Sequence, residues 1–213
     1  MAMHLMRIVL PDEPGQLGAV ATALGTQGAD IASVEIVGRE NGSVIDDFMV
    51  QLAPDRLPDQ VVSACLALPG VRVEWIAFYP EGGTLQSDLE ALDRMTNRPA
   101  RAAEILTDSA VTVFHAHWAV LVADVAEAPG QVHGTAQAPE LTGEQLAALS
   151  PYDQVRAVSP AADWLPGWRD VIVAIAPVPG GRAIVLGRQG GPEFLPSELA
   201  RLGHLAALVP TGA

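Results

Sequence analysis

One stretch decides how the first third of this chain folds: Asp12-Glu13-Pro14-Gly15-Gln16-Leu17-Gly18. It follows a short apolar run at residues 5–10, whose β-branched members favour a strand that ends at Pro11. Two acids, a proline and a glycine in succession are the composition of a tight turn. From Leu17 onward, apolar residues recur at spacings of three and four, which predicts a helix. The stretch is therefore expected to join a strand to a helix.

The rest of residues 1–78 continues this alternation of elements. Asn41-Gly42 is a strong signal for a hairpin turn between strands at 31–37 and 43–52. Pro58 suits the first turn of a second helix, and Pro69-Gly70 stops that helix before a last strand at 71–78. The predicted order is β-α-β-β-α-β, which is the split βαβ or ferredoxin-like unit.

Two adjacent acids stand out in the predicted strand at 43–52. Alternate residues of a strand share a face, so Asp46 is expected beside the apolar Val44 and Phe48 and is the odd member of that face. Asp47 then points to the other side of the sheet. The two carboxylates are therefore not expected to work as a catalytic pair.

Residues 79–99 are predicted to be a linker and the start of a connecting helix, and 100–213 a second domain. The linker itself is placed at Tyr79–Ser87, and the polar stretch after it favours a helix that breaks near Asn97–Pro99. The remaining pattern predicts strands at 111–114, 118–125, 170–178 and 182–188, a loop at 126–141, and helices at 142–149 and after residue 192. A chain of 213 residues suits two such domains, and the expected fold class is α+β.

Composition and charge exclude several functions. The formal net charge is −13, and the scattered arginines form no basic cluster, so nucleic acid and anionic membranes are poor partners. The chain has no lysine, which excludes Schiff-base and pyridoxal-phosphate chemistry and a P-loop. One cysteine allows no disulfide within the chain. Without a signal pattern or an apolar run of about 20 residues, a cytoplasmic location is expected.

Residues 1–78 resemble the ACT family of small-molecule-binding domains. The resemblance rests on the predicted element order and on four segments: Asp12-Glu13-Pro14-Gly15-Gln16-Leu17, Gly28-Ala29-Asp30-Ile31, Asp46-Asp47-Phe48 and Leu68-Pro69-Gly70-Val71. It implies a ligand at the first loop, usually against the neighbouring subunit of a homodimer, with the position of Asp30 contributing. The implied ligand-binding residues are Asp12, Glu13, Pro14, Gly15, Gln16, Leu17, Gly18, Asp30 and Ile31.

The chemistry of this loop fits an amino acid or a related metabolite. A helix that begins near Gln16 points unpaired N–H groups at the loop, and such an end prefers carboxylates. An acid at position 12, 13 or 30 can meet an ammonium group; the family often has asparagine where this chain has Asp30. The alternative is that Pro14-Gly15 forms a purely structural turn in a dimerisation domain.

Residues 100–208 resemble a divergent GAF-type domain. The matching features are a strand that begins at Trp118, a hairpin at Gly180-Gly181, and the segment Leu186-Gly187-Arg188-Gln189-Gly190-Gly191-Pro192-Glu193-Phe194 before a last helix. The resemblance implies a small-molecule sensor and names no ligand. Gly187–Pro192 lacks P-loop spacing and is interpreted as a structural turn, and Trp164 and Trp168 as core or lid packing.

Few residues suggest catalysis. His115 and His117 would share a face of a strand and could bind one metal ion, but a third ligand such as Asp124 or His133 is not specified by the spacing. Cys65 fits a buried apolar stripe better than a nucleophile. No catalytic residue, metal or cofactor is therefore expected.

Three hypotheses follow from the sequence. The first is a non-enzymatic regulatory protein that senses an amino acid or related metabolite at a homodimer interface. The second is an interaction or dimerisation module that acts as a subunit of a separate enzyme or regulator without binding a ligand, through the edge strands of its sheet. The third is an enzyme with a metal at His115 and His117.

Overall fold

The computed structural model describes residues 2–78, 84–168, 170–190 and 193–211. The chain divides into two compact units, an N-terminal unit at Met1–Glu81 and a C-terminal unit at Gly82–Ala213. Each contains one antiparallel sheet with helices, so the fold is mixed α+β. Each unit is described by itself below.

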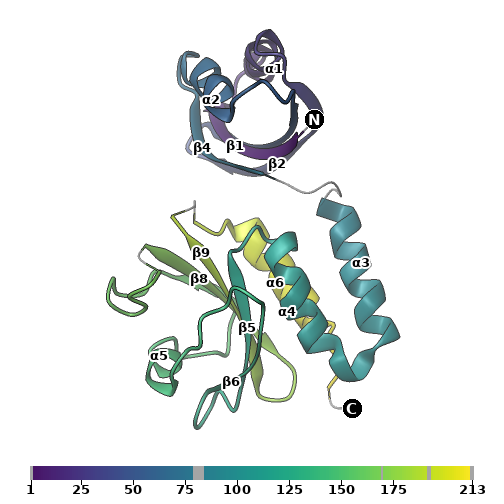
Figure 1. The fold of residues 1–213 in the computed structure, drawn as a ribbon, viewed down its shortest axis with the longest axis vertical. Coiled ribbons are helices and arrows are strands. Elements are labelled where there is room, and N and C mark those ends of the chain that lie inside the picture. Colours follow the sequence, from purple (N-terminus) through teal and green to yellow (C-terminus); the bar gives the residue numbers. More distant parts are fainter. Residues whose placement is uncertain (1, 79–83, 169, 191–192, 212–213) are drawn as a thin grey trace. The chain divides into compact units, whose positions relative to one another are not determined.

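The N-terminal unit has the element order that the sequence predicts. Its elements are β1 (Ala2–Pro11), α1 (Gln16–Thr26), β2 (Asp30–Glu40), β3 (Ser43–Leu52), α2 (Pro58–Leu66) and β4 (Arg72–Phe78). The strands lie in the order β2-β3-β1-β4, and every neighbouring pair is antiparallel. Both helices cover the same side of this sheet (Figure 1). The predicted β-α-β-β-α-β order is thus confirmed.

One face of the sheet and the two helices form the core of the N-terminal unit. Alternate residues of β1 and β3 supply the sheet side, and the buried stripes of α1 and α2 supply the helix side. The members of this cluster include Met6, Ile8, Leu10, Val20, Leu24, Phe48, Val50, Leu52, Val61 and Cys65. The opposite face carries a smaller apolar group of Leu5, Met49, Met3 and Trp75.

The C-terminal unit is built on a five-stranded antiparallel sheet in the order β6-β5-β9-β8-β7. Its helices are α3 (Thr84–Asn97), α4 (Ala102–Val113), α5 (Gly143–Ala147) and α6 (Pro196–Ala207), with a short 3-10 turn, η1 (Pro99–Arg101), before α4. Its strands are β5 (Trp118–Ala123), β6 (Gly130–Gly134), β7 (Arg156–Val158), β8 (Val171–Val178) and β9 (Arg182–Gln189). None of the helices in the described residues is both long and apolar enough to cross a bilayer.

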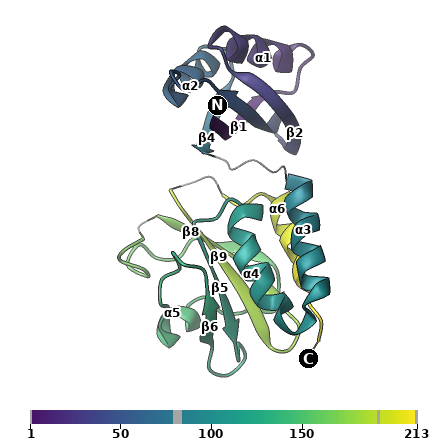
Figure 2. The same ribbon diagram turned by 45° about the vertical axis from the view of Figure 1, so that its right-hand side comes forward.

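Side chains alternate to the two faces of this sheet and build two cores. Helices α4 and α6 cover one face, where Leu106 and Leu202 pack against Leu121 and Ile184 (Figure 2). On the other face, Leu146 of α5 packs with Trp118 and with other residues of β5, β8 and β9. Layers on both sides explain why β8 and β9 are almost continuously apolar.

Three expectations for the C-terminal unit need correction. The predicted strand at 111–114 is wrong, because α4 continues to Val113; its buried residues Leu106, Ala110 and Val113 recur at helical spacing. The predicted loop at 126–141 contains β6, and β7 was not predicted. Residues 84–87 were assigned to the linker but belong to α3, and 79–83 lie outside the described residues.

Candidate functional site

The loop between β1 and α1 is shaped by a single glycine. Gly15 is the N-cap of α1 and has a φ of 96°, a left-handed conformation that other residues resist. Among the described residues no side chain caps this helix end, and no atom lies within 4 Å of a Cβ placed at Gly15 or Gly18. The amides of Gln16 and Ala19 are bonded to the carbonyls of Glu13 and Gly15, so the N–H groups of Leu17 and Gly18 are those of the first turn that can receive an anionic group.

The loop is fixed to the β2–β3 hairpin rather than hanging free. The amide of Asp12 donates a 2.9 Å hydrogen bond to the carbonyl of Gly42, and the amide of Gln16 donates to the carbonyl of Glu13 over 3.3 Å. The Asp12 carboxylate also lies 3.6 Å from the Arg39 guanidinium, although both side chains are exposed and this pair adds little stability. The contacts place the loop over the hairpin end of β3.

Asp46 lies buried in β3 near this end of the sheet. It pairs in register with Ile8 of β1 and Ile36 of β2, on the face that the helices cover. Since α1 joins β1 to β2, which lie on either side of β3, the helix must cross over β3. The Asp46 side chain is 2% exposed, and its Oδ1 has no hydrogen-bond partner among the described residues.

The surroundings of Asp46 disfavour its charged form. Burial is the largest cause that raises the pKa of the Asp46 carboxyl, and the negative charge of neighbouring Asp47 adds to it. The positive charge of Arg39 lowers the pKa, and the negative charge of Asp12 raises it again. The electrostatic influence of Asp12 and Arg39 links this buried carboxyl to the loop above it. The sequence singled out Asp46 as the odd member of its face, and its burial agrees with that prediction.

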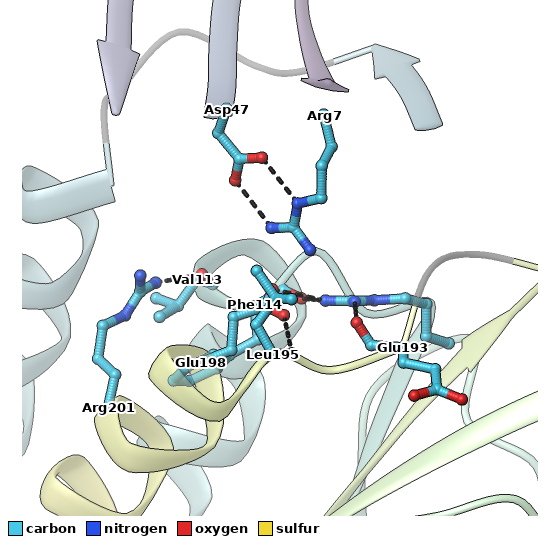
Figure 3. A network of polar contacts seen from close by, with 9 residues as sticks. Arg7, Asp47, Val113, Phe114, Glu193, Leu195, Glu198 and Arg201 are labelled. Carbon is cyan, nitrogen blue, oxygen red and sulfur yellow. Dashed lines mark hydrogen bonds and ion pairs between the residues drawn. The ribbon is translucent and has the colours of Figure 1, made fainter. Parts of the chain in front are cut away.

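Asp47 points to the opposite face of the sheet and has a full complement of contacts. Its two carboxylate oxygens accept hydrogen bonds of 2.7 and 2.8 Å from Nε and Nη2 of Arg7 (Figure 3). Arg7 lies on the adjacent strand β1, paired in register with Asp47. As expected, the two neighbouring aspartates do not meet.

The structure does not bring all the predicted ligand-binding residues together within one chain. Residues 12–18 are contiguous at the hairpin end of the sheet, whereas Asp30 and Ile31 begin β2 and pair with Gln51 and Val50 at the other end. Strand rise over the eight positions from Ser43 to Gln51 separates the two groups by about 26 Å. One small ligand cannot contact both groups in the same unit.

Strand β2 forms an edge of the N-terminal sheet. Its only neighbour in the described part of the sheet is β3, and the side chains of Val34 and Ile36 are 37% and 54% exposed. Leu17, in the first turn of α1, is 45% exposed. An edge of eleven residues with exposed apolar side chains can pair with a strand of another molecule.

The two histidines considered as metal ligands do not lie together on a strand. His115 sits in a left-handed turn with a φ of 49°, after α4 and before β5. His117 accepts a 3.1 Å hydrogen bond at Nδ1 from the amide of Gln189. His133, one possible third ligand, instead pairs through Nε2 with Asp108 at 2.7 Å. Within the described ranges no group of three or more acidic, cysteine or histidine side chains is placed to hold a metal ion.

Two other titratable side chains have shifted pKa values. Burial raises the pKa of the Cys65 thiol to about 11, so the side chain is an apolar core member of α2, as predicted. Burial lowers the pKa of His117, and the positive charge of Arg188 lowers it further. The raised pKa keeps the Cys65 thiol protonated at neutral pH, so Cys65 is not tuned toward nucleophilic chemistry.

Sequence reasoning missed a buried polar cluster in the C-terminal unit. The Nη2 of Arg188, on β9, lies 2.9 Å from Glu198 of α6 and 2.7 Å from the carbonyl of Phe114 (Figure 3). The guanidinium also lies over the ring of Phe194, 4.0 Å from its centroid. Because these contacts join β9, α6 and the end of α4, Arg188 fastens the helices to the sheet. The glycine-arginine motif thus has a structural role that only the tertiary contacts reveal.

Gly187 of the same motif is required by packing. A Cβ at Gly187 would lie 1.9 Å from Cε2 of Trp118, the residue that pairs with it across β5 and β9. The indole therefore lies directly over the glycine. Gly187 therefore has a packing role, but the predicted structural turn at Gly187–Pro192 needs correction: residues 187–189 belong to β9, and 191–192 lie outside the described residues.

Comparisons with known proteins give partial matches. No protein-family model matches the chain. The NAD-dependent malic enzyme 1 of Bacillus subtilis (strain 168) is 33% identical over 93 residues, which are 40% of this chain and 21% of that enzyme. The chain thus spans about a fifth of the length of this curated relative.

Two solved structures show weak likeness. A formyltetrahydrofolate deformylase from Pseudomonas putida KT2440 is 12% identical with a TM-score of 0.28, over 45% of this chain and 38% of that one. An unknown protein from Galdieria sulphuraria is also 12% identical, with a TM-score of 0.33 over 96% and 91% of the two chains. Scores this low carry no argument about fold or function, so the function is inferred from the geometry of the chain itself.

Proposed function

We propose that this chain is a non-catalytic regulatory protein whose N-terminal unit, an ACT-type domain, binds an amino acid or a related small metabolite in a homodimer. The observation that carries the proposal is the N-terminus of α1 at Gly15, which no side chain caps, together with the buried carboxyl of Asp46, whose pKa the charge of Asp12 in the loop helps to raise. A helix end attracts a carboxylate, and an acid attracts an ammonium group. The two features together suit a zwitterion.

Different groups around the loop bind the two charged ends of the ligand. The exposed N–H groups at the start of α1 receive the ligand carboxylate. The ammonium group is met by acids near the loop, of which Asp12 is exposed and Asp46 is buried. A ligand cation close to Asp46 would offset the burial that raises the pKa of this carboxyl. No metal or other cofactor takes part in this binding.

The separation of the predicted ligand-binding residues supports a dimer. Strands β1 and β2 run in the same direction, so the loop after β1 and the start of β2 lie at opposite ends of the sheet. If two copies pair antiparallel along β2, a two-fold axis brings Asp30 of one copy toward residues 12–18 of the other. The edge position of β2 and its exposed Val34 and Ile36 suit this contact.

The C-terminal unit then serves as the second half of the regulator, as a GAF-like domain. Its sheet is enclosed by helices α4 and α6 on one face and by α5 and long loops on the other. Arg188 and Glu198 fix α6 to this sheet. A rigid unit of this kind is suited to passing a change of state in the N-terminal unit to a partner.

The direct test is calorimetric titration of the full chain with each of the common amino acids. We expect at least one to bind, and Asp12→Asn and Asp46→Asn to weaken that binding by about tenfold each, the scale of one charge-assisted contact. Asp55→Asn is the matched control, because Asp55 is an exposed acid in the β3–α2 loop. A lack of heat and of thermal stabilisation with every amino acid at millimolar concentration would refute amino-acid binding.

The dimer is tested separately by sedimentation velocity. Ile36→Lys places a charge on the exposed β2 edge and is expected to convert dimer to monomer and to weaken ligand binding in parallel. Leu66→Lys is the control, because Leu66 of α2 is similarly exposed at 52%. A wild-type chain that stays monomeric at micromolar concentration, with and without ligand, would contradict the shared site.

The second candidate is an interaction module that works with a separate enzyme and binds no small molecule. The free edge of β2 favours it, and so does the match to part of the NAD-dependent malic enzyme 1. This candidate predicts a complex with an enzyme that is lost in Ile36→Lys, while no amino acid changes the melting temperature of the chain. The titration above therefore separates the two functions.

A further inference from the structure

A hollow of about 650 Å³ opens in the C-terminal unit beside the short helix α5. One wall comes from α5 and its N-cap, including Glu144, Gln145 and Ala148, and the other from the segment that follows β7. Trp164 lines the hollow and belongs to the core cluster on the α5 face of the sheet. The volume falls in the range of small-molecule pockets, about 300–1,000 Å³.

The aromatic wall is held rigidly by a reciprocal pair of hydrogen bonds. The indole N–H of Trp164 donates to the carbonyl of Gln145 over 2.8 Å, and the side-chain amide of Gln145 donates to the carbonyl of Trp164 over 2.7 Å. Gln145 also closes a capping box with Thr142 at the start of α5. The two walls are thus tied together before any ligand arrives, which lowers the entropic cost of binding.

The lining combines apolar surface with negative charge. Its two charged residues, Glu144 and Asp163, are both acids that face solvent from opposite walls. Val158, Pro160 and Pro166 supply apolar surface beside the indole. A cation next to an aromatic ring is attracted by the face of the ring, and two carboxylates add attraction that a neutral ligand does not receive.

A second hollow next to the first repeats this chemistry. It has a volume of about 430 Å³, and it shares Pro160 and Ala161 with the larger hollow. Trp168 and Asp170 line it, so it too offers an indole and a carboxylate. A short strap at residues 159–162 therefore separates two hollows of the same character.

We propose that the larger hollow is a second ligand site, which binds a small organic cation with an apolar body, of the alkylammonium or quaternary ammonium class. The apolar body packs on Trp164 and the prolines, and the cationic head lies between Glu144 and Asp163. The site lies within the C-terminal unit and is independent of the loop at residues 12–18. It gives the chain a second input, a cation rather than the zwitterion proposed for the loop at residues 12–18.

The test uses choline and its neutral isostere 3,3-dimethyl-1-butanol, which differ in the charge of the head group. Both are titrated into the full ¹⁵N-labelled chain while amide shifts are followed by NMR. Choline is expected to shift the amides of Gln145, Ala148 and Val158, and to bind about tenfold more tightly than the isostere. Equal affinity of the two compounds, no shift at tens of millimolar choline, or shifts confined to residues 12–18 would each overturn the proposal.

Variants of the two acids complete the test. The double variant Glu144→Gln with Asp163→Asn is expected to bind choline at least fivefold more weakly, on the order of 1 kcal/mol, and to bind the neutral isostere unchanged. Glu140→Gln is the matched control, because Glu140 is an exposed acid nearby that does not line the hollow. Since all three side chains are exposed, their exchange should leave the circular dichroism and melting temperature intact. Unchanged choline affinity in the folded double variant would overturn the proposal.

Discussion

The two faces of strand β3 treat neighbouring carboxylates in opposite ways. On one face, Asp47 accepts two hydrogen bonds from Arg7, which lies opposite it on β1. On the other face, Asp46 is buried beside Ile8 and Ile36, with an oxygen that has no partner among the described residues. The same side chain at adjacent positions thus has both oxygens paired on one face and, within the described residues, an oxygen without a partner on the other.

The difference separates a structural carboxylate from a candidate functional one. A bidentate arginine–carboxylate pair joins two strands and satisfies both oxygens, so Asp47 has a role in the fold that needs no ligand. A buried carboxyl without a partner lowers stability, and such groups are commonly retained where binding or catalysis needs them. We therefore expect Asp46 to lower the stability of the fold and to contribute to ligand binding, so that a substitution there changes the two in opposite directions.

The largest effect on stability is expected from removing the ion pair between Arg7 and Asp47. Arg7→Met keeps the length of the side chain but removes both donors to Asp47, and it should lower the free energy of unfolding by about 2–3 kcal/mol. Urea unfolding followed by circular dichroism measures the change. Adding Asp47→Leu to this variant should recover part of the loss, because no carboxylate is then left without its partner. A loss below about 0.5 kcal/mol would mean that the pair behaves as a surface ion pair.

Replacement of Asp46 is expected to have a smaller effect on stability, and of the opposite sign. Asp46→Asn removes a buried charge with no hydrogen bond to lose at Oδ1, and it should raise the free energy of unfolding at pH 7 by about 1 kcal/mol. The same change at Asp47 should lower it. If both variants destabilise the chain to the same degree, the contrast between the two faces is wrong.

The effect of Asp46 should also depend on pH. Its pKa is raised in the folded chain, so the folded state binds this proton more tightly than the unfolded state does. The tighter binding of this proton adds to the free energy of unfolding. This contribution is fully present below about pH 4, the usual aspartate pKa, and it is lost as the pH rises through the raised pKa. Urea titrations at a series of pH values should therefore show the advantage of Asp46→Asn growing from low pH toward neutrality. An advantage that is constant from pH 3 to 7 would contradict the raised pKa.

The elements of the N-terminal unit were predictable because local rules fix them. Asn41 and Gly42 both have positive φ angles, of 49° and 76°, as the predicted hairpin turn requires. Gly15 takes the left-handed conformation that permits the turn into α1. Each signal acts within a few residues, so the sequence displays it directly. Strand β3 begins and ends at the predicted residues for the same reason.

The C-terminal unit was harder to predict because its short elements depend on distant contacts. The β-branched residues before Phe114 favour a strand by local propensity, but the buried stripe of α4 against the sheet overrides that preference. Strand β6 has glycine at both ends and exists through pairing with β5. The helix at Thr142, with its complete capping box, and the hairpin at Gly180-Gly181, where both glycines have positive φ, carried their own local signals.

The candidate site could be predicted from the sequence only in part, for a similar reason. The loop chemistry at Gly15 is local and was predicted, and the anomaly of Asp46 was visible in the alternation of β3. Its lack of a partner depends on side chains from other strands and from α1, which no local pattern specifies. The distance between Asp30 and the loop follows from strand order and direction, which a set of predicted elements does not contain.

The smallest effect extends the comparison to His117, an exposed side chain whose Nδ1 accepts one hydrogen bond. Burial and Arg188 lower its pKa, so the folded state resists the proton that the unfolded state accepts near pH 6.5. Its contribution to stability is present above that pH and is lost as the pH falls through the lowered pKa. His117→Asn keeps an acceptor for the amide of Gln189 but does not titrate. Between pH 7 and 5, the melting temperature of wild type should fall slightly more than that of this variant, because solvent screens the exposed His117 side chain and keeps the effect small. If the melting temperatures of wild type and variant depend on pH in the same way, the pKa of His117 is equal in the folded and the unfolded chain, and the prediction is wrong.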